Sequence, residues 1–344
     1  MIIVTGGAGF IGSNLVRSLN QRDVTEILVV DDLSDGDKCR NIQDCSFLDY
    51  IDKDDFLALV KIKDCRLAGA QAIFHQGACS DTMEADGKYI MENNYEYSKA
   101  VFHYCQQQYV QFIYASSAST YGGNSVFVED PKNEQALNAY AYSKLLFDRY
   151  LRRHWSDLVA QVVGLRYFNV YGRGESHKGR MASVAFHFYN QFKENGYVKL
   201  FAGSGGYADG EQLRDFVWVD DIVKVNFHFL DNPEYSGIFN AGTGAAGSFN
   251  QVAAATLNAI NSENKTVADW VAEGLIKYID FPEALVGKYQ SYTQADLSKL
   301  RSEGDFTQEF ANVNVGVAAY IAQLQDASIP VSYTHLTLPT IYSV

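Results

Sequence analysis

The first fourteen residues, MIIVTGGAGFIGSN, constrain the fold of this chain more than any other stretch. A short apolar run from Ile2 to Val4 breaks into glycines and then continues with residues that can begin a helix. Glycine has no Cβ, so a turn made of it can bring the backbone close to a phosphate. The following helix N-terminus adds free N–H groups and a partial positive charge. This pattern is typical of a dinucleotide site, which we expect at Gly6, Gly9 and Gly12.

A second apolar run, Ile27 to Val30, follows about twenty residues later and ends in Asp31 and Asp32. An acid at this place holds the ribose hydroxyls of an NAD-type cofactor, although solvated aspartates at a strand end are the plainer interpretation. Lys38 and Lys53 follow, and either could neutralise the 2′-phosphate of NADP, which an acid would repel. The residues themselves therefore leave NADP and NAD both open.

Length and charge limit the possible classes of protein. With 344 residues the chain can bury a large core, in one large or two modest domains. A formal net charge of −13 argues against nucleic acid or an anionic membrane as the main partner. We see no run of eighteen apolar residues and no charged leader, so we expect a cytoplasmic protein without a membrane span. Five cysteines without CxxC spacing indicate reduced thiols and no metal site.

Strand-like and helix-like segments alternate up to about residue 165. The expected strands are Met1–Thr5, Glu26–Val30, Ala72–His75, Gln111–Ala115 and Val159–Arg166, separated by helices such as Gly12–Gln21, Lys88–Gln107 and Tyr140–His154. This alternation predicts an α/β fold, a Rossmann-type doubly wound parallel sheet covered by helices on both faces. We place this dinucleotide-binding domain at residues 1–168, with a return of the chain at about 213–243.

The remainder, residues 169–329, is rich in glycine and aromatic residues, which favours a smaller α/β substrate-binding lobe. A final helix is expected near Asn312–Gln325. The last fifteen residues, 330–344, lack helical periodicity and read like a translated adapter fragment, so we interpret them as a non-native or disordered tail.

A second chemical pattern is Tyr140-x-x-x-Lys144, which a helix places on one face. A phenol is too weak an acid to serve as a base at neutral pH, but a neighbouring ammonium stabilises its phenolate. Tyr140 could then take a proton from a substrate hydroxyl while hydride leaves the same carbon. Ser116, at the end of a predicted strand, could hydrogen-bond the reacting oxygen. In isolation such a pair is more often a surface feature, but the glycine turn and the strand-end serines favour catalysis.

The chain resembles the extended short-chain dehydrogenase/reductases that act on nucleotide sugars. The resemblance is carried by TGGAGFIGSN, SSAST-YGG, Tyr140-x-x-x-Lys144 and the segment Leu165–Gly172. Four further segments, Phe74–Ser80, Asp86–Lys99, His177–His187 and Gly287–Leu297, are similar to the epimerases of ADP-heptoses within this family. The similarity extends from Met1 to about Gln325.

The resemblance implies an NADP-dependent epimerase of ADP-heptose that inverts carbon 6 for the inner core of lipopolysaccharide, acting as a homo-oligomer, specifically a pentamer. It implies cofactor contacts, in addition to the glycines, from Phe10, Ile11, Asp31, Asp32, Lys38, Lys53, Gln76, Gly77, Ala78, Cys79, Ser80, Asn93, Lys144, Val170 and Lys178. It implies substrate contacts from Ser116, Asn169, Arg180, His187, Phe201, Ala202, Gly203, Ser204, Arg214 and Tyr289. The guanidinium of Arg214 suits the phosphates of ADP, because it can donate two parallel hydrogen bonds.

The resemblance also implies that Lys178 is a second base. Inversion at an exocyclic carbon takes hydride from one face and returns it to the other, so the hydroxyl points two ways in the two epimers. Bases on opposite sides of a ketone, Tyr140 and Lys178, would meet that need. A single tyrosine with a substrate that rotates as a whole is the alternative, and an ordinary solvated loop lysine is the plain interpretation of Lys178.

The sequence departs from the family pattern in three places. Arg173-Gly174-Glu175 stands where Pro-Arg-Glu is usual, Arg180 replaces a serine of some relatives, and the segment Gly203–Leu213 is long and rich in glycine. Two other functions stay open. One is a nucleotide-sugar 4-epimerase or dehydratase, although a dehydratase needs an Asp-Glu pair that Ser117 to Thr120 lacks. The other is a non-catalytic NADP-binding sensor.

Overall fold

The computed structural model describes residues 1–282 and 290–326, and it divides the chain into two compact units. The first unit holds Met1–Tyr167, Ile222–Ala241 and Leu297–Thr307, and the second holds the other described residues. The chain returns to the first unit at Ile222–Ala241, where the sequence analysis placed a return at about 213–243, and again at Leu297–Thr307. The expected tail at 330–344 lies outside the described residues.

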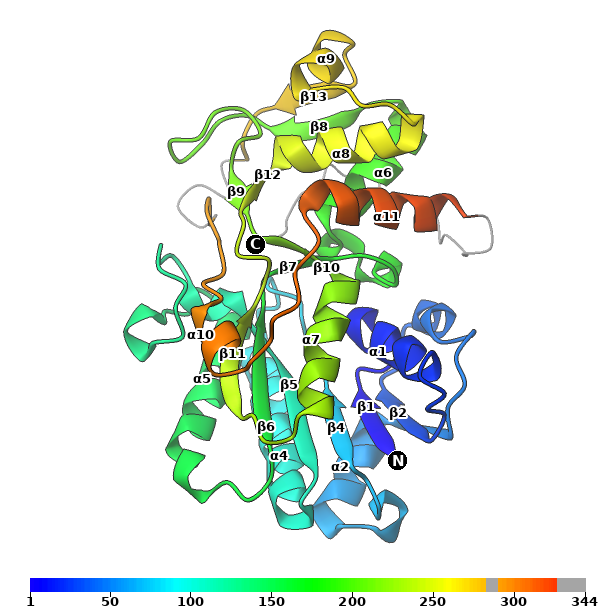
Figure 1. The fold of residues 1–344 in the computed structure, drawn as a ribbon, viewed down its shortest axis with the longest axis vertical. Helices are drawn as coiled ribbons and strands as arrows, with labels where there is room; N and C mark the ends of the chain where they lie inside the picture. The colour runs from blue at the N-terminus through cyan, green and yellow to red at the C-terminus, as the bar shows by residue number, and fades with distance from the viewer. Residues whose placement is uncertain (283–289, 327–344) are drawn as a thin grey trace. The chain divides into compact units, whose positions relative to one another are not determined.

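The first unit is built on a parallel sheet of seven strands in the order β11-β6-β5-β4-β1-β2-β3 (Figure 1). The strands are β1 (Ile2–Thr5), β2 (Ile27–Asp31), β3 (Asp49–Asp52), β4 (Ala72–His75), β5 (Gln111–Ser117), β6 (Val162–Tyr167) and β11 (Gly237–Ala241). The sequence missed β3, because its residues, DYID, are polar and lie on the edge strand. The interior strands β1, β2 and β4 are short, mainly apolar and fully buried runs, as is usual where helices cover both faces of a sheet.

Helices cover this sheet on both faces (Figure 1). On one face Ile73 and Phe112 share a buried core with α2 (Lys53–Ile62), α4 (Tyr97–Gln108) and α5 (Ala139–Arg153). On the other, Phe74 packs against Phe227 of α7 (Val219–Asp231) at 6.0 Å between ring centres. The remaining helices of the unit are α1 (Phe10–Asn20), α3 (Gly87–Ile90), which runs through a π-helical turn (Met91–Glu96) into α4, and α10 (Ser298–Ser302). The predicted Rossmann-type fold is confirmed.

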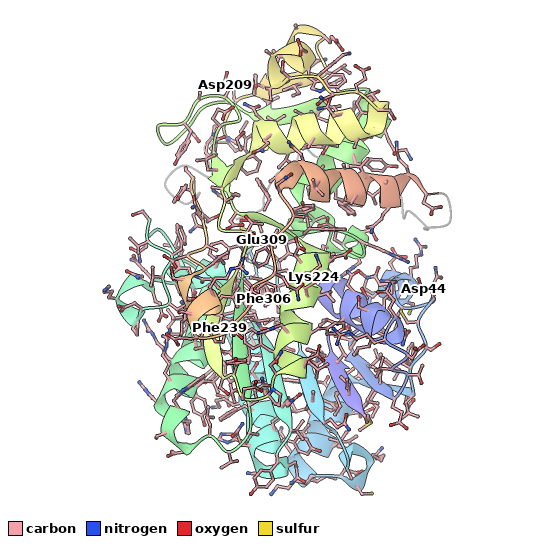
Figure 2. The ribbon with its side chains drawn as sticks, in the orientation of Figure 1. Asp44, Asp209, Lys224, Phe239, Phe306 and Glu309 are labelled. Atoms are coloured by element: carbon pink, nitrogen blue, oxygen red, sulfur yellow. The ribbon has the colours of Figure 1, made fainter. Side chains whose placement is uncertain are left out.

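The late segment Leu297–Thr307 joins the first unit through aromatic contacts. Phe306 packs against His228 of α7 at 5.4 Å between ring centres, and the Lys299 ammonium lies 5.5 Å from the ring of Phe239 in β11. Figure 2 labels Phe239 and Phe306, which are both buried. No local sequence pattern indicates that the chain comes back to the first unit this late.

In its described residues, the second unit packs four helices around short strand pairs. The helices are α6 (Val184–Asn195), α8 (Phe249–Asn261), α9 (Val267–Ala272) and α11 (Val313–Gln325), and the strand pairs are β7 (Asn169–Tyr171) with β10 (Phe216–Trp218), β8 (Val198–Phe201) with β13 (Ile276–Ile279), and β9 (Leu213–Arg214) with β12 (Gly247–Ser248). Phe186, Leu257, Trp270 and Tyr320 are among its buried core residues. Within the described ranges no helix is long and apolar enough to cross a membrane.

Candidate active site

The glycine turn between β1 and α1 is closed by its own backbone. Gly9 N donates to Gly6 O at 3.0 Å, and Gly7 N donates to Val30 O at 3.2 Å. Gly6 has a φ of 65°, and a Cβ placed there would lie 2.7 Å from the backbone nitrogen of Gly77. At Gly12 a Cβ would lie only 2.1 Å from Gly6 O. The turn therefore requires glycine at both positions, and its open backbone fits the close approach of a pyrophosphate.

Other residues of the chain already bind the carboxylate of Asp31. Its Oδ2 accepts from Ala8 N in the glycine turn at 2.8 Å, and its Oδ1 accepts from Asp32 N at 2.7 Å. The Lys38 ammonium pairs with the same carboxylate and also donates to Asp32 O at 2.8 Å. Hydrogen bonds from Ser34 lower the pKa of Asp32, whose carboxylate stays negative at neutral pH. Asp31 thus shapes the turn, and Asp32 is the more accessible acid.

A pocket of about 190 Å³ opens beside this turn. Nine of the expected cofactor residues line it, namely Gly6, Asp31, Asp32, Lys38, Lys53, Gly77, Ala78, Cys79 and Asn93. The sequence missed Thr5, Ser34, Tyr89 and Tyr97, which also line it. Both tyrosines fall within a predicted helix, and the tertiary fold brings them to the pocket, where Tyr97 Oη donates to Lys53 O at 3.0 Å. Glycine backbone, acids and two lysines in one pocket fit a dinucleotide.

The other expected cofactor residues lie elsewhere. Gly9, Phe10, Ile11 and Gly12 form the turn and the start of α1, and Ser80 is exposed. The Gln76 amide bonds the hydroxyl of Tyr167 at 3.1 Å. Val170 and Lys178 belong to the second unit.

The predicted Tyr140-Lys144 pair lies on α5, which begins at Ala139. Asn138 caps this helix by accepting from Ala141 N at 2.8 Å. Lys144 is buried, and its Nζ donates to Ala115 O in β5 at 2.9 Å. Burial lowers the pKa of Lys144 to about 8. Burial also raises the pKa of Tyr140, while a hydrogen bond with Ser117 acts in the opposite direction.

Ser116 and Ser117 face opposite sides of the sheet, as successive residues of a strand do. Ser116 is 2% exposed and its hydroxyl donates to Asp148 Oδ2 at 2.9 Å, away from Tyr140. Ser117 is the serine that bonds Tyr140. The sequence reasoning selected Ser116 and missed Ser117. The alternation of side chains along a strand could have indicated this, because it places Ser116 on the same face as Tyr114, which is buried.

Within the second unit, Lys178 lies in a short helical turn, Ser176–Met181, that is interrupted at Gly179 with a φ of 53°. The buried Glu175 holds this loop by accepting from Ser183 N at 2.6 Å and Ser183 Oγ at 2.7 Å. Burial lowers the pKa of Lys178, and the charge of Glu175 opposes that shift. Arg180 is exposed, and burial lowers the pKa of His187 on α6.

The remaining substrate candidates are spread over this unit. Asn169 lies in β7, Phe201 ends β8, and Arg214 is buried in β9 with its Nη1 donating to Leu213 O at 3.0 Å. The long segment 203–213 is closed by its own bonds, Gly203 N to Asp209 Oδ1 at 2.7 Å and Gln212 Nε2 to Ser204 Oγ at 3.2 Å. Ala202 adds its carbonyl, which accepts from Gln212 at 3.1 Å. Tyr289 lies outside the described residues.

A parallel α/β sheet with a glycine turn, a strand-end acid and Tyr140-x-x-x-Lys144 on a neighbouring helix defines a class of nucleotide-binding enzymes. The model of the NAD dependent epimerase/dehydratase family matches residues 2–242, and the chain belongs to this family. The family uses a nicotinamide dinucleotide, and it agrees with the resemblance found in the sequence.

Individual relatives are more specific. The chain is 57% identical to an ADP-L-glycero-D-manno-heptose-6-epimerase of Alkalilimnicola ehrlichii, over 95% of this chain and 98% of the relative. It is 55% identical to the protein of the same name from Thiobacillus denitrificans, over 94% and 98%. The crystal structure of the Helicobacter pylori ADP-L-glycero-D-manno-heptose-6-epimerase has a TM-score of 0.78 at 28% identity, covering 94% of this chain and 96% of that one.

Proposed function

We propose that this protein interconverts ADP-D-glycero-D-manno-heptose and ADP-L-glycero-D-manno-heptose by inverting carbon 6. The observation that carries the proposal is the 57% identity to a heptose epimerase over nearly the whole chain, which includes the Tyr140-Lys144 pair. The product would supply the inner core of lipopolysaccharide in a Gram-negative cytoplasm, and the protein would act as a homo-oligomer, a pentamer.

The proposed cofactor is NADP, bound by the pocket beside the glycine turn. The Lys38 and Lys53 side chains line this pocket, and their charges would balance a 2′-phosphate next to Asp31 and Asp32. Bound there, a nicotinamide cofactor would supply hydride transfer from and back to carbon 6, and the reaction would have no net redox change.

The protein's own residues supply proton transfer and orientation. Tyr140 takes the proton of the 6-hydroxyl of one epimer, and the Lys144 ammonium stabilises the phenolate that this requires. We assign Ser117, in place of Ser116, to hydrogen-bond the reacting oxygen, because its side chain shares a hydrogen bond with Tyr140. Lys178 would be the base for the other epimer, and its lowered pKa suits a lysine that gains and loses a proton.

The first experiment incubates purified protein with ADP-D-glycero-D-manno-heptose, without added cofactor, and separates the epimers by chromatography. We expect conversion to the L-glycero epimer, no net appearance of reduced nicotinamide, and no conversion by Tyr140→Phe. Absence of conversion even with added NADP and NAD would contradict the proposal. Turnover of UDP-hexoses instead would favour a 4-epimerase, and binding of NADP without any turnover would favour a sensor.

The role of Lys178 has its own test. Lys178→Met should abolish epimerisation, whereas Lys193→Met, on α6 of the same unit, should leave it unchanged. Full activity of Lys178→Met would leave Tyr140 as the single base, with a substrate that rotates between the two half-reactions.

A further inference from the structure

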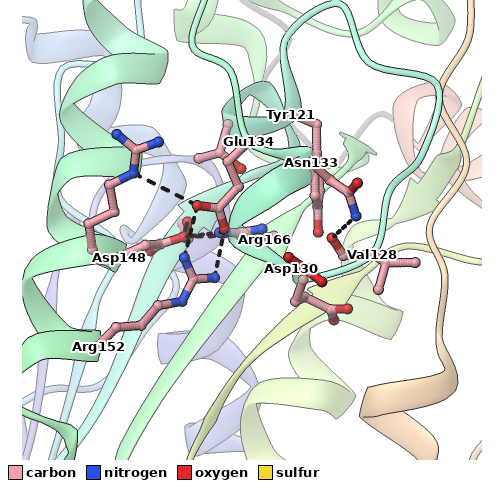
Figure 3. A network of polar contacts seen from close by, with 12 residues as sticks. Tyr121, Val128, Asp130, Asn133, Glu134, Asp148, Arg152 and Arg166 are labelled. Atoms are coloured by element: carbon pink, nitrogen blue, oxygen red, sulfur yellow. Dashed lines mark hydrogen bonds and ion pairs between the residues drawn. The ribbon is translucent and has the colours of Figure 1, made fainter.

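Behind the catalytic helix lies a buried network of charges that the proposed reaction does not use (Figure 3). Arg166 of β6 is 0% exposed, and its Nε and Nη2 donate to Asp148 Oδ2 at 3.0 and 2.9 Å. Its Nη2 also donates to Glu134, which pairs with Arg152. The Arg166 guanidinium lies 4.9 Å from the ring of Tyr121. Two carboxylates therefore share one buried arginine.

Only one of these two carboxylates reaches the strand that carries the serines. Asp148 accepts from Tyr114 Oη at 2.8 Å and from Ser116 Oγ at 2.9 Å, on either side of Ala115. The carbonyl of Ala115 is the acceptor for Lys144. Lys144 and Asp148 are one helical turn apart on α5, so together they hold three successive residues at the end of β5. Tyr140 lies one further turn along the same helix face.

Asp148 also determines the charge balance around Lys144. The titratable groups that act on Lys144 are Asp148 on its own helix and Cys79, while Lys144 in turn acts on His75 of β4. Burial raises the pKa of the Cys79 thiol and lowers that of His75 to about 3, so both are neutral at pH 7. Burial also raises the pKa of Tyr140, which favours its neutral phenol before cofactor and substrate bind. Asp148 is the carboxylate of this group, and it also pairs with the Arg166 guanidinium.

We propose that Asp148 is a positioning residue for the reaction, holding the end of β5 against α5 and keeping the Lys144 ammonium charged. This inference rests on the proposed function of Tyr140 and Lys144. Glu134 is the matched control for Asp148. It is also a carboxylate that binds Arg166, but among the described residues its partners are arginines, not Tyr114 or Ser116. A purely structural ion-pair network would make the two carboxylates equivalent.

The test compares Asp148→Asn with the matched variant Glu134→Gln. In the wild type, kcat/KM should fall at high pH as Lys144 loses its proton. The pH at which this fall occurs, called here the alkaline limb of the profile, should be about one pH unit lower in Asp148→Asn, because an opposite charge a few ångströms from Lys144 has been removed. Glu134→Gln should leave the limb in place, even if it lowers the melting temperature equally. An unchanged limb in Asp148→Asn, or equal shifts in both variants, would overturn the proposal.

Two further variants keep the test decisive. Asp148→Glu restores the charge and should return the limb toward its wild-type position. If Asp148→Asn does not fold, the double variant Asp148→Asn with Arg166→Gln removes both members of the buried pair and keeps the interior neutral. Its kcat/KM should fall at a lower pH than that of Arg166→Gln alone, and identical pH profiles of these two variants would also overturn the proposal.

A second readout separates this proposal from the proposed reaction. The side-chain signal of Lys144, assigned by its loss in Lys144→Met, can be titrated by NMR without any substrate. A lower midpoint in Asp148→Asn than in Glu134→Gln would support the proposal even if the sugar substrate were wrong. Equal midpoints would overturn it whatever the enzyme turns over.

Discussion

At the scale of single residues, the candidate site depends on which way each side chain of β5 points. Ser116 and Ser117 are neighbours in the sequence, yet one is bound to Asp148 in the interior and the other is bound to Tyr140. A substitution at each should therefore have a different kind of effect.

We expect Ser117→Ala to lower kcat by about a hundredfold, as loss of a donor to a reacting oxygen does in other enzymes. Ser116→Ala should leave kcat nearly unchanged and cost about 1 kcal/mol of stability, because Asp148 keeps Tyr114 and Arg166 as partners. Steady-state kinetics and urea unfolding of both variants measure this. A large loss of kcat in Ser116→Ala with normal activity in Ser117→Ala would reverse the assignment.

The lowered pKa of Lys144 predicts a pH dependence of activity. The ammonium is required to stabilise the Tyr140 phenolate, and it loses its proton at about pH 8. Activity should therefore fall as the pH rises above 8, with a slope that approaches about tenfold per pH unit. A kcat/KM profile that stays flat up to about pH 10, which is roughly the ordinary pKa of a lysine side chain, would show that the charge of Lys144 is not needed.

At the scale of elements, the strand-turn-helix unit formed by β1 and α1 is held by a very close approach of backbone to backbone. Gly12 lies in the first turn of α1, directly over the carbonyl of Gly6. The geometry of the phosphate-binding turn therefore depends on the absence of one methyl group.

Gly12→Ala should destabilise the fold by about 1–3 kcal/mol and abolish copurification of the dinucleotide, because a Cβ cannot stand 2.1 Å from Gly6 O. Gly123→Ala is the control, since nothing lies within 4 Å of a Cβ at that position. Thermal unfolding and nucleotide extraction compare the two. Normal cofactor content in Gly12→Ala would mean that the turn can rearrange.

At the scale of the whole molecule, stability in acid depends on buried neutral groups as well as on ion pairs. His75, in the centre of the first unit's sheet, is an example. Its Nδ1 lies 2.7 Å from Thr5 Oγ1, and its Nε2 lies 2.8 Å from Ser98 Oγ. Ser98 Oγ donates its own proton to Asn94 O at 2.5 Å, so it must accept from Nε2–H. His75 is thus the neutral Nε2–H form, and burial opposes the addition of a second proton by lowering its pKa.

The pKa of His75 falls from 6.5 to about 3 on folding, so the unfolded chain binds the extra proton first as the pH is lowered. Stability should therefore fall between pH 6.5 and 3 by up to about 1.4 kcal/mol per pH unit from this group. His75→Gln should flatten that slope in urea unfolding measured at several pH values. An equally steep slope in His75→Gln would assign the acid sensitivity to other groups.

The sequence by itself determined the strand-turn-helix at the N-terminus, the α/β alternation and the Tyr140-Lys144 face of one helix. These depend on glycine conformation and on residue spacing, which are local properties of the chain. The final helix, expected near Asn312–Gln325 and observed at Val313–Gln325, was predictable for the same reason.

Tertiary structure alone decided which atoms those residues meet. Asp31 proved to bind the glycine turn and Lys38, Ser116 proved to point into the Arg166 network, and Tyr89 and Tyr97 proved to line the pocket. Apart from Lys38, which is seven residues from Asp31, these partners come from other strands or helices, so no pattern of local spacing could indicate them. The edge strand β3 escaped prediction for a related reason, because pairing with β2 holds it in place and its own polar residues do not.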